Sequence, residues 1–157
     1  MRWNEIGSEV CSVARALSVV GDRWTLLILR EAFMRTRRFQ DFQEHLGAAR
    51  NIVADRLQKL VDAGVMERRQ YQDRPARYEY RLTDKGVELY PVVLALANWG
   101  DKWLDEGKGR PIENVHRPCG HVMHAVATCS ECGEELDPRQ VESKLGPALR
   151  ALSKRDL

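Results

Sequence analysis

The spacing of apolar residues, and the order in which that spacing changes along the chain, is the feature that most constrains the fold. Four successive segments carry apolar residues at helical spacing, at about residues 8–20, 23–33, 39–46 and 50–62. The period then changes to that of strands over residues 65–71 and 77–82. Helices joined by short turns and followed by a two-stranded hairpin form a winged helix-turn-helix. The sequence therefore predicts a mainly α fold with a small β hairpin (α+β).

Local signals mark where several of these elements begin and end. Asp22 is a candidate N-cap for the second helix, and Gly47 and Gly64 are expected to end the third and fourth helices. Thr83 is a candidate N-cap for a long helix that runs to about residue 104. Pro91 lies inside this helix and is expected to kink it.

A glycine-rich linker at residues 107–111 divides the chain into two predicted domains. Residues 8–105 are expected to form the winged helix-turn-helix domain, which binds DNA and carries the dimer contacts. Residues 112–157 are expected to form a small Cys/His-containing appendage with a terminal helix at about 138–152.

Composition and charge narrow the class of protein. With 43% hydrophobic and 31% charged residues, the 157-residue chain is expected to be soluble and globular. Because it has no apolar run near the roughly 20 residues that span a bilayer and no signal peptide, we expect a cytoplasmic location, no membrane partner and reduced cysteines. Residues 35–81 hold eleven Arg and Lys against seven Asp and Glu, an excess of basic charge that favours a polyanionic partner.

The segment at 50–62 is expected to be the recognition helix in the major groove of duplex DNA. Its polar face carries Arg50, Asn51, Ala54, Asp55, Gln58 and Lys59. Because recognition helices contact base edges near their N-termini, Arg50 and Asn51 are the predicted base contacts. Arg56 and Lys59 are better placed for phosphates. An ordinary amphipathic surface helix would show a similar pattern.

The hairpin at about 65–82 is expected to be a basic wing on the flanking backbone or minor groove. Arg68 and Arg69 lie on its first strand, Arg74 lies at its tip, and Arg77 begins its second strand. A solvated turn without a DNA role is the alternative for these arginines.

Several separated motifs resemble the HxlR family of bacterial transcription regulators. They are CSVARAL at 11–17, VGDRWTLLILR at 20–30, RFQDF at 38–42, DRLQKL at 55–60, YRLTDKG at 80–86, Pro91 and Trp99-Gly100. This resemblance covers about residues 8–105. It implies a homodimeric winged-helix DNA-binding regulator, with dimer contacts from the terminal helices, and it does not identify the operator or the inducer. A small molecule or an oxidant is a candidate effector.

The helix that contains Trp99 and Trp103 fits this dimer role, because exposed tryptophans are frequent at interfaces. Packing inside one subunit is the alternative.

Three of the four cysteines lie near the C-terminus at the spacing of metal ligands. His116 and Cys119 form one pair with two intervening residues, and Cys129 and Cys132 form another. A glycine follows each pair and allows a tight knuckle, and two knuckles complete a tetrahedral site in zinc ribbons. The pattern predicts one structural zinc per chain in a zinc-ribbon-like appendage.

Other roles for these residues stay open. His121 or His124 could replace His116 as the histidine ligand. Cys129 and Cys132 could instead form a redox pair or a disulfide, or the thiols could pack without metal. A catalytic zinc is not expected, because the sequence offers no convincing general base.

Cys11 lies near the start of the first helix, where a helix N-terminus can lower a thiol pKa. The family resemblance suggests a redox switch between subunits at this position. A small buried hydrophobic role is the favoured alternative.

Two further functions compete with DNA binding. A winged-helix protein–protein adaptor would share the fold, although the basic wing and the Arg50-Asn51 pair favour DNA. A zinc enzyme would need a nucleophile–base pair or a phosphate loop, and we find neither, so no catalytic residues are expected.

Overall fold

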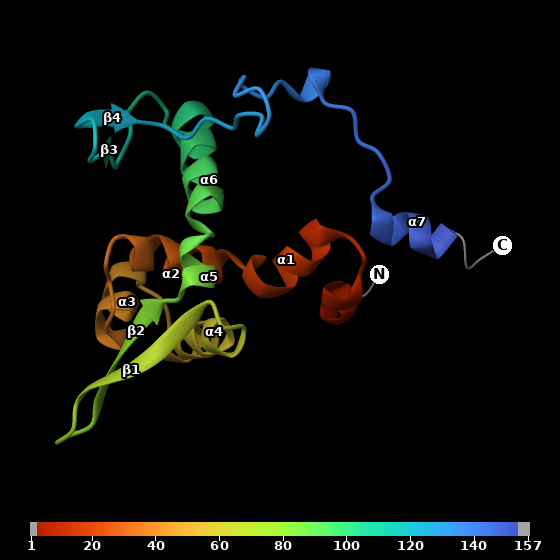
Figure 1. Cartoon of the computed structure of the whole chain (residues 1–157). Coiled ribbons are helices and arrows are strands. Elements are labelled where there is room, and N and C mark those ends of the chain that lie inside the picture. Colours follow the sequence, from red (N-terminus) through yellow and green to blue (C-terminus); the bar gives the residue numbers. More distant parts are fainter. Residues whose placement is uncertain (1–2, 154–157) are drawn as a thin grey trace. The chain divides into compact units, whose positions relative to one another are not determined.

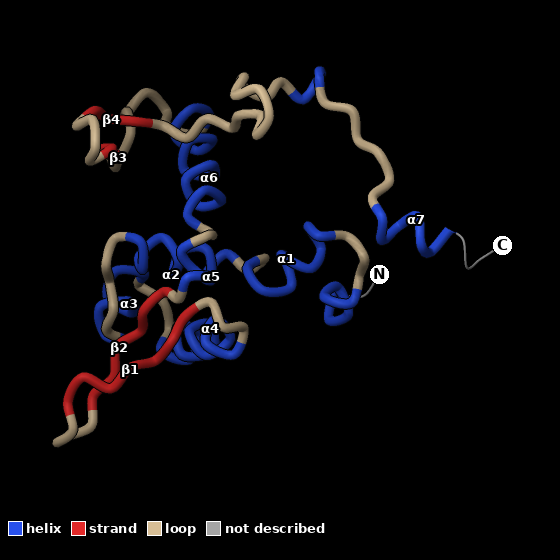
Figure 2. Tube along the Cα trace, in the orientation of Figure 1, coloured by secondary structure: helices blue, strands red, loops and turns tan. Residues whose placement is uncertain are grey.

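The computed structural model describes residues 3–153 (Figures 1 and 2). Its elements are η1 (Trp3–Ser8), α1 (Ser12–Val20), α2 (Arg23–Phe33), α3 (Phe39–Leu46), α4 (Arg50–Asp62), β1 (Met66–Gln72), β2 (Arg77–Leu82), α5 (Asp84–Val87), α6 (Tyr90–Trp103), β3 (Asn114–His116), β4 (His121–Met123), η2 (Pro138–Gln140) and α7 (Pro147–Ser153). The chain divides into two compact units, residues 1–93 and 94–157. Residues 154–157, the end of the predicted appendage, lie outside the described residues.

The core of the first unit lies where α2, α3 and α4 meet. Its fully buried side chains include Ile28, Leu29, Phe42, Val53, Leu57 and Leu60. Each such side chain contributes about 1.5–3 kcal/mol by leaving water. Trp24 is only half-buried and packs at the edge of this cluster. The predicted helices at 23–33, 39–46 and 50–62 are confirmed as α2, α3 and α4.

The predicted helix boundaries in this unit have clear local causes. The Asp22 carboxylate accepts hydrogen bonds from the backbone N–H groups of Trp24 and Thr25, at 3.0 and 3.3 Å, and so caps α2. Gly47 and Gly64 follow α3 and α4 with φ of 58° and 67°, a left-handed conformation that strains residues with a Cβ.

The wing is an antiparallel β1–β2 hairpin that projects beyond the helices of its unit (Figure 2). Its base is joined to the N-terminus of α3, because the Tyr80 N–H donates to the Arg37 carbonyl at 2.7 Å and Arg38 bridges to Glu79. Where β1 begins, a Cβ on Gly86 would lie 2.1 Å from the Val65 carbonyl oxygen. The close approach of α5 to β1 therefore requires a glycine there.

Three helix predictions differ from the structure. The segment at 8–20 begins its α-helix only at Ser12, after η1. The long helix predicted after the wing is two helices, α5 and α6, so Pro91 lies in the first turn of α6, where its missing N–H is not needed. The terminal helix predicted at 138–152 is η2 followed by α7.

The second unit contains most of α6, the β3–β4 hairpin and α7. A further turn is closed by a bridge between Thr128 and Glu135, and the Asn98 amide donates to the Ala125 carbonyl at 3.0 Å. None of residues 95–151, whose burial the structure describes throughout, is buried. This stretch therefore has no apolar core of its own.

No helix in the described part of the chain combines the length and apolar character needed to cross a bilayer.

Candidate nucleic-acid interface

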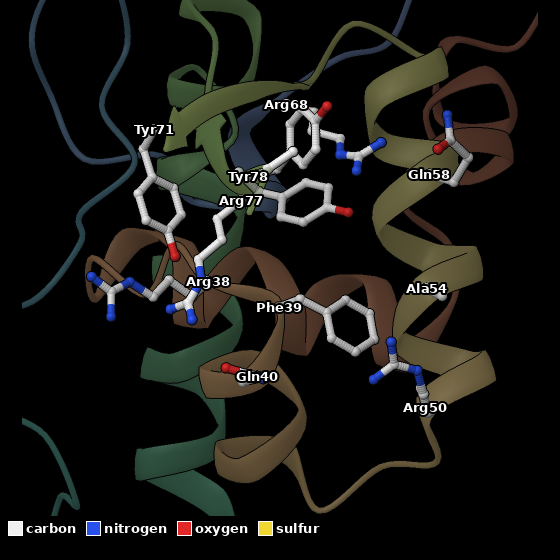
Figure 3. Close-up of a pocket in the computed structure, with 12 residues that line it drawn as sticks. Arg38, Phe39, Gln40, Arg50, Ala54, Gln58, Arg68, Tyr71, Arg77 and Tyr78 are labelled. Atoms are coloured by element: carbon white, nitrogen blue, oxygen red, sulfur yellow. The ribbon is translucent and has the colours of Figure 1, made fainter. Parts of the chain in front are cut away.

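A groove of about 550 Å³ lies between one face of α4 and the wing (Figure 3). We call it the α4–wing groove. Its lining residues are Arg38, Phe39, Gln40, Arg50, Ala54, Gln58, Arg68, Tyr71, Ala76, Arg77, Tyr78 and Tyr80. Four of them are arginines, four are aromatic and none is acidic, so the groove presents uncompensated positive charge and flat apolar surfaces.

On α4, the groove face consists of Arg50, Ala54 and Gln58. These residues are spaced by four, so they lie in succession along one side of the helix (Figure 3). The Arg50 guanidinium lies 4.9 Å from the centroid of the Phe39 ring, which holds it by a cation–π contact. Asn51 is exposed on α4 but does not line the groove.

Two further arginines of the groove, Arg68 on the wing and Arg38 before α3, also contact aromatic rings. Arg68 lies 3.8 Å from the centroid of Tyr78, and Arg38 lies 5.3 Å from that of Tyr71. A guanidinium stacked on a ring keeps its N–H edges available for an anion. Arg74 is exposed in the turn between the strands and is outside the groove lining.

Arg56 joins α4 to the start of α2. Its Nε and Nη2 donate to the Asp22 carboxylate at 2.8 and 3.3 Å, and its Nη1 contacts Asp55. The hydrogen bond from Arg56 is the main cause that lowers the pKa of Asp22 below its usual value. This guanidinium therefore fastens α4 to the capped start of α2. Its predicted contact with a DNA phosphate stays a prediction.

Asp55 and Lys59 form an ion pair one turn apart on α4, with an N–O distance of 3.1 Å. The hydrogen bond from Lys59 is the largest cause that lowers the pKa of Asp55. Because both side chains are more than half exposed, this pair adds little stability. It leaves Lys59 on the surface with its charge partly compensated.

A buried polar network fixes α3 against α2. Glu31 is 5% exposed and accepts hydrogen bonds from Arg30 Nη2 at 2.7 Å and Thr36 Oγ1 at 3.1 Å. His45 Nδ1 lies 2.8 Å from the same carboxylate and donates, since a carboxylate only accepts. Burial alone would raise the pKa of Glu31, but these bonds outweigh it and lower the pKa.

Sequence reasoning missed several groove residues, namely Arg38, Phe39, Gln40, Tyr71 and Tyr78. A usable signal was the basic run at residues 35–38 directly before a helix, together with tyrosines on both strands of a basic hairpin. These residues lie far apart along the chain, and only the pairing of the wing with the segment before α3 brings them together.

A model of the HxlR-like helix-turn-helix family matches residues 19–108 of the chain. The chain belongs to this family. The uncharacterized HTH-type transcriptional regulator Mb3122 of Mycobacterium bovis is 44% identical to this HxlR-like protein over 140 residues, which are 89% of each chain. That alignment is longer than residues 1–108, so it also includes part of the C-terminal unit.

Two solved structures extend the comparison. The candidate transcription factor PA1607 is 35% identical with a TM-score of 0.79, and the match covers 88% of this chain and 96% of that one. The redox regulator HypR in its oxidized form is 28% identical with a TM-score of 0.55, and that match covers 59% of this chain and 96% of the HypR chain. The winged-helix fold class is thereby confirmed, and the family and its relatives are transcription regulators, not enzymes.

The two helices at the ends of the winged helix of this HxlR-like regulator each expose an apolar stripe. On α6 the stripe is Val92, Leu96, Trp99 and Trp103, with the two tryptophans 58% and 63% exposed. On α1 it includes Val13 and Leu17. Packing of Trp99 and Trp103 inside one subunit, the alternative for these residues, is wrong.

All four cysteines are free thiols. Cys11 precedes α1 as its N-cap residue and is exposed, so the prediction that it is a small buried hydrophobe is wrong. Cys119 and Cys132 are exposed and Cys129 is half-buried, so packed thiols also do not describe this cluster. Backbone N–H groups of Cys132 and Glu131 donate toward the Cys129 sulfur and lower its pKa.

The candidate metal ligands form two separate pairs. His116 Nδ1 lies 3.3 Å from Cys119 Sγ, and Cys129 lies in one turn with Cys132. Within the described residues no three His, Cys, Asp or Glu side chains are grouped so that they could hold a metal. The structure therefore brings together the members of each pair and does not join the two pairs, so the predicted zinc site stays a prediction.

Proposed function

We propose that this regulator binds duplex DNA sequence-specifically as a homodimer, with α4 in the major groove and the wing, residues 65–82, on the flanking backbone or minor groove. The observation that carries the proposal is the α4–wing groove, with four arginines and no acidic lining residue. The major groove is about 12 Å wide and admits one helix. The hairpin beside α4 then lies against the adjacent strand of the duplex.

The groove face of α4 suggests which bases are contacted. Arginine pairs with the O6 and N7 of guanine, glutamine with the N6 and N7 of adenine, and a small methyl side chain with the methyl group of thymine. Arg50, Gln58 and Ala54 supply these three groups along one side of α4. We therefore assign base contacts to them, and Asn51 becomes a flanking contact.

The remaining basic side chains are suited to phosphates. Arg68 and Arg77 line the wing side of the groove, and Arg74 lies at the exposed tip. Arg38 is held at the N-terminus of α3 beside them. Phosphate contacts of this kind position the protein and do not select a sequence.

A homodimer accounts for the apolar stripes of α1 and α6. Large exposed apolar patches, and tryptophan in particular, are typical of interfaces. Two copies of α4 on one face of the duplex would contact half-sites about one helical turn, or a multiple of it, apart.

The test is a binding assay of purified protein against a pool of genomic fragments, repeated at several salt concentrations. We expect a few fragments to be enriched, with affinity that falls steeply as salt rises, because phosphate contacts release counterions. Binding that is equally weak for all fragments, or absent, would favour the alternative of a protein–protein adaptor.

Oxidant sensing is a second candidate function. It is favoured by the exposure of Cys11 at the start of α1, beside the apolar stripe, and by the similarity to the redox regulator HypR. Two Cys11 thiols, one from each subunit, would join in a disulfide and pass two electrons and two protons to an oxidant such as diamide. DNA affinity should then change on diamide treatment in the parent and not in Cys11→Ser. An equal response of both proteins would exclude Cys11 as the sensor.

A further inference from the structure

We propose that His116, Cys119, Cys129 and Cys132 bind one zinc ion per chain, and that this metal organises the C-terminal unit of the regulator. The proposal does not depend on DNA binding. It rests on two preformed pairs of ligands, on the matching backbone geometry of the two turns that carry them, and on the lack of an apolar core in the surrounding segment.

The first pair lies at the tip of the β3–β4 hairpin. His116 ends β3, and the backbone N–H groups of Cys119 and Gly120 donate to the His116 carbonyl at 3.2 and 2.8 Å. Gly120 has a φ of 73° and so allows the chain to turn back into β4. His116 Nδ1 and Cys119 Sγ lie 3.3 Å apart. Tetrahedral bonds of about 2.3 Å to sulfur and 2.0–2.1 Å to nitrogen set a ligand separation of about 3.5 Å, so this pair is already at metal-binding distance.

The second pair, Cys129 and Cys132, lies in a turn with a similar backbone arrangement. The bridge between Thr128 and Glu135 closes a hairpin-like turn, and the Gly133 N–H donates to the Cys129 carbonyl at 2.9 Å. Gly133 has a φ of 77°, close to that of Gly120. The backbone N–H of Cys132 donates toward the Cys129 sulfur. Each turn thus has a ligand, two spacer residues, a cysteine and a left-handed glycine.

Three thiolates and one imidazole are a ligand set of structural zinc sites. Only residues 124–127, which have no regular secondary structure, separate the end of β4 from the second turn. Metal binding would require one turn to fold onto the other about this connection, so that the two pairs reach one ion. Because residues 95–151 include no buried side chain, metal binding supplies the folding free energy that an apolar core would otherwise supply.

The first test is the metal content of full-length protein purified under reducing conditions without chelator. We expect about one equivalent of zinc per chain. The control Cys11→Ser, which removes the one cysteine outside the two turns, should retain that zinc. Cys119→Ser and Cys132→Ser should each lose most of it, because each removes a ligand from a different pair.

A second measurement does not depend on how the variants fold. Zinc should protect three of the four thiols of the parent protein from a thiol reagent, so that only Cys11 reacts quickly, and chelation should expose all four. Cobalt added to the metal-free parent should give the intense visible bands of a tetrahedral thiolate site.

Three results would overturn the proposal. The first is less than about a tenth of an equivalent of zinc in the parent protein, together with no cobalt bands in excess metal. The second is a zinc content that is unchanged in both Cys119→Ser and Cys132→Ser. The third is that all four thiols react equally fast before and after chelation. A Cys129–Cys132 disulfide found under non-reducing conditions, with no zinc retained under reducing ones, would assign this pair to redox chemistry instead.

Discussion

The contacts of Asp22 lead to a specific stability prediction, because its carboxylate makes two kinds of interaction that different substitutions can separate. Asp22 caps α2 through two backbone N–H groups and pairs with Arg56 of α4 through two guanidinium nitrogens. Loss of an N-cap costs about 0.5–2 kcal/mol. The ion pair, whose side chains are 23% and 39% exposed, adds about 0.5–1 kcal/mol. Asp22→Ala should therefore lower the free energy of unfolding by about 2 kcal/mol.

The helix cap and the ion pair can be separated by the choice of variant. Asparagine caps a helix as well as aspartate, so Asp22→Asn should lose only the ion pair, about 0.5–1 kcal/mol. Arg56→Met should lose a similar amount, and the double variant should add little to either. Thermal melts followed by circular dichroism suffice, because about 1 kcal/mol shifts Tm by roughly 4–8 °C in a domain of this size.

The pH dependence follows from the lowered pKa of Asp22. A carboxyl whose pKa is lower in the folded state stabilises the protein above its unfolded pKa of about 3.9, and this contribution is lost as pH falls through the folded value. The stability difference between the parent and Asp22→Asn should thus be constant from about pH 5 to 7 and shrink below about pH 4. A melting temperature of Asp22→Ala equal to that of the parent at pH 7 would refute the structural role of this pair. A salt dependence of DNA binding altered by Arg56→Met would indicate that Arg56 also contacts a phosphate.

Three further perturbations test other parts of the account. Arg74→Ala should reduce the slope of log affinity against log salt by about 1.8 for a bound dimer, about 0.9 for each subunit, whereas Lys144→Ala, which removes an exposed charge outside the groove, should not; equal slopes for all three proteins would exclude a phosphate contact at the wing tip. Glu31→Ala should lower the free energy of unfolding by about 1–3 kcal/mol in denaturant titrations, because the buried Thr36 hydroxyl loses its acceptor, and an unchanged midpoint would contradict this. Trp99→Glu should convert the dimer to monomer in sedimentation velocity, and a parent that is already monomeric at micromolar concentration would remove the basis for the dimer.

The helices α2 to α4 and the wing could be predicted because their signals are local. Apolar spacing, a cap at Asp22 and glycines at the helix ends act within a few residues of one another. The break between α5 and α6 could not be predicted. A proline within a helical pattern is compatible with one kinked helix and with the first turn of a second helix. The structure resolves this in favour of a new first turn.

The interface was predicted in outline and not in detail. The helix at 50–62 and the hairpin after it were correctly located, but the side of α4 that faces the groove is Arg50, Ala54 and Gln58, without Asn51. The role of Arg56 depends on a partner 34 residues away, which no local pattern reveals. In the C-terminal unit, spacing alone indicated the two ligand pairs, and the structure adds the backbone geometry of each turn.

The most direct test of the central claim is methylation protection of guanine N7 on an enriched fragment. Guanine N7 lies in the major groove and is an acceptor for arginine. We expect two clusters of protected guanines, separated by about one helical turn or a multiple of it, and loss of protection at one guanine in each cluster with Arg50→Ala. Guanines that remain equally reactive with and without bound protein, or a protection pattern unchanged in Arg50→Ala, would contradict the placement of α4 in the major groove.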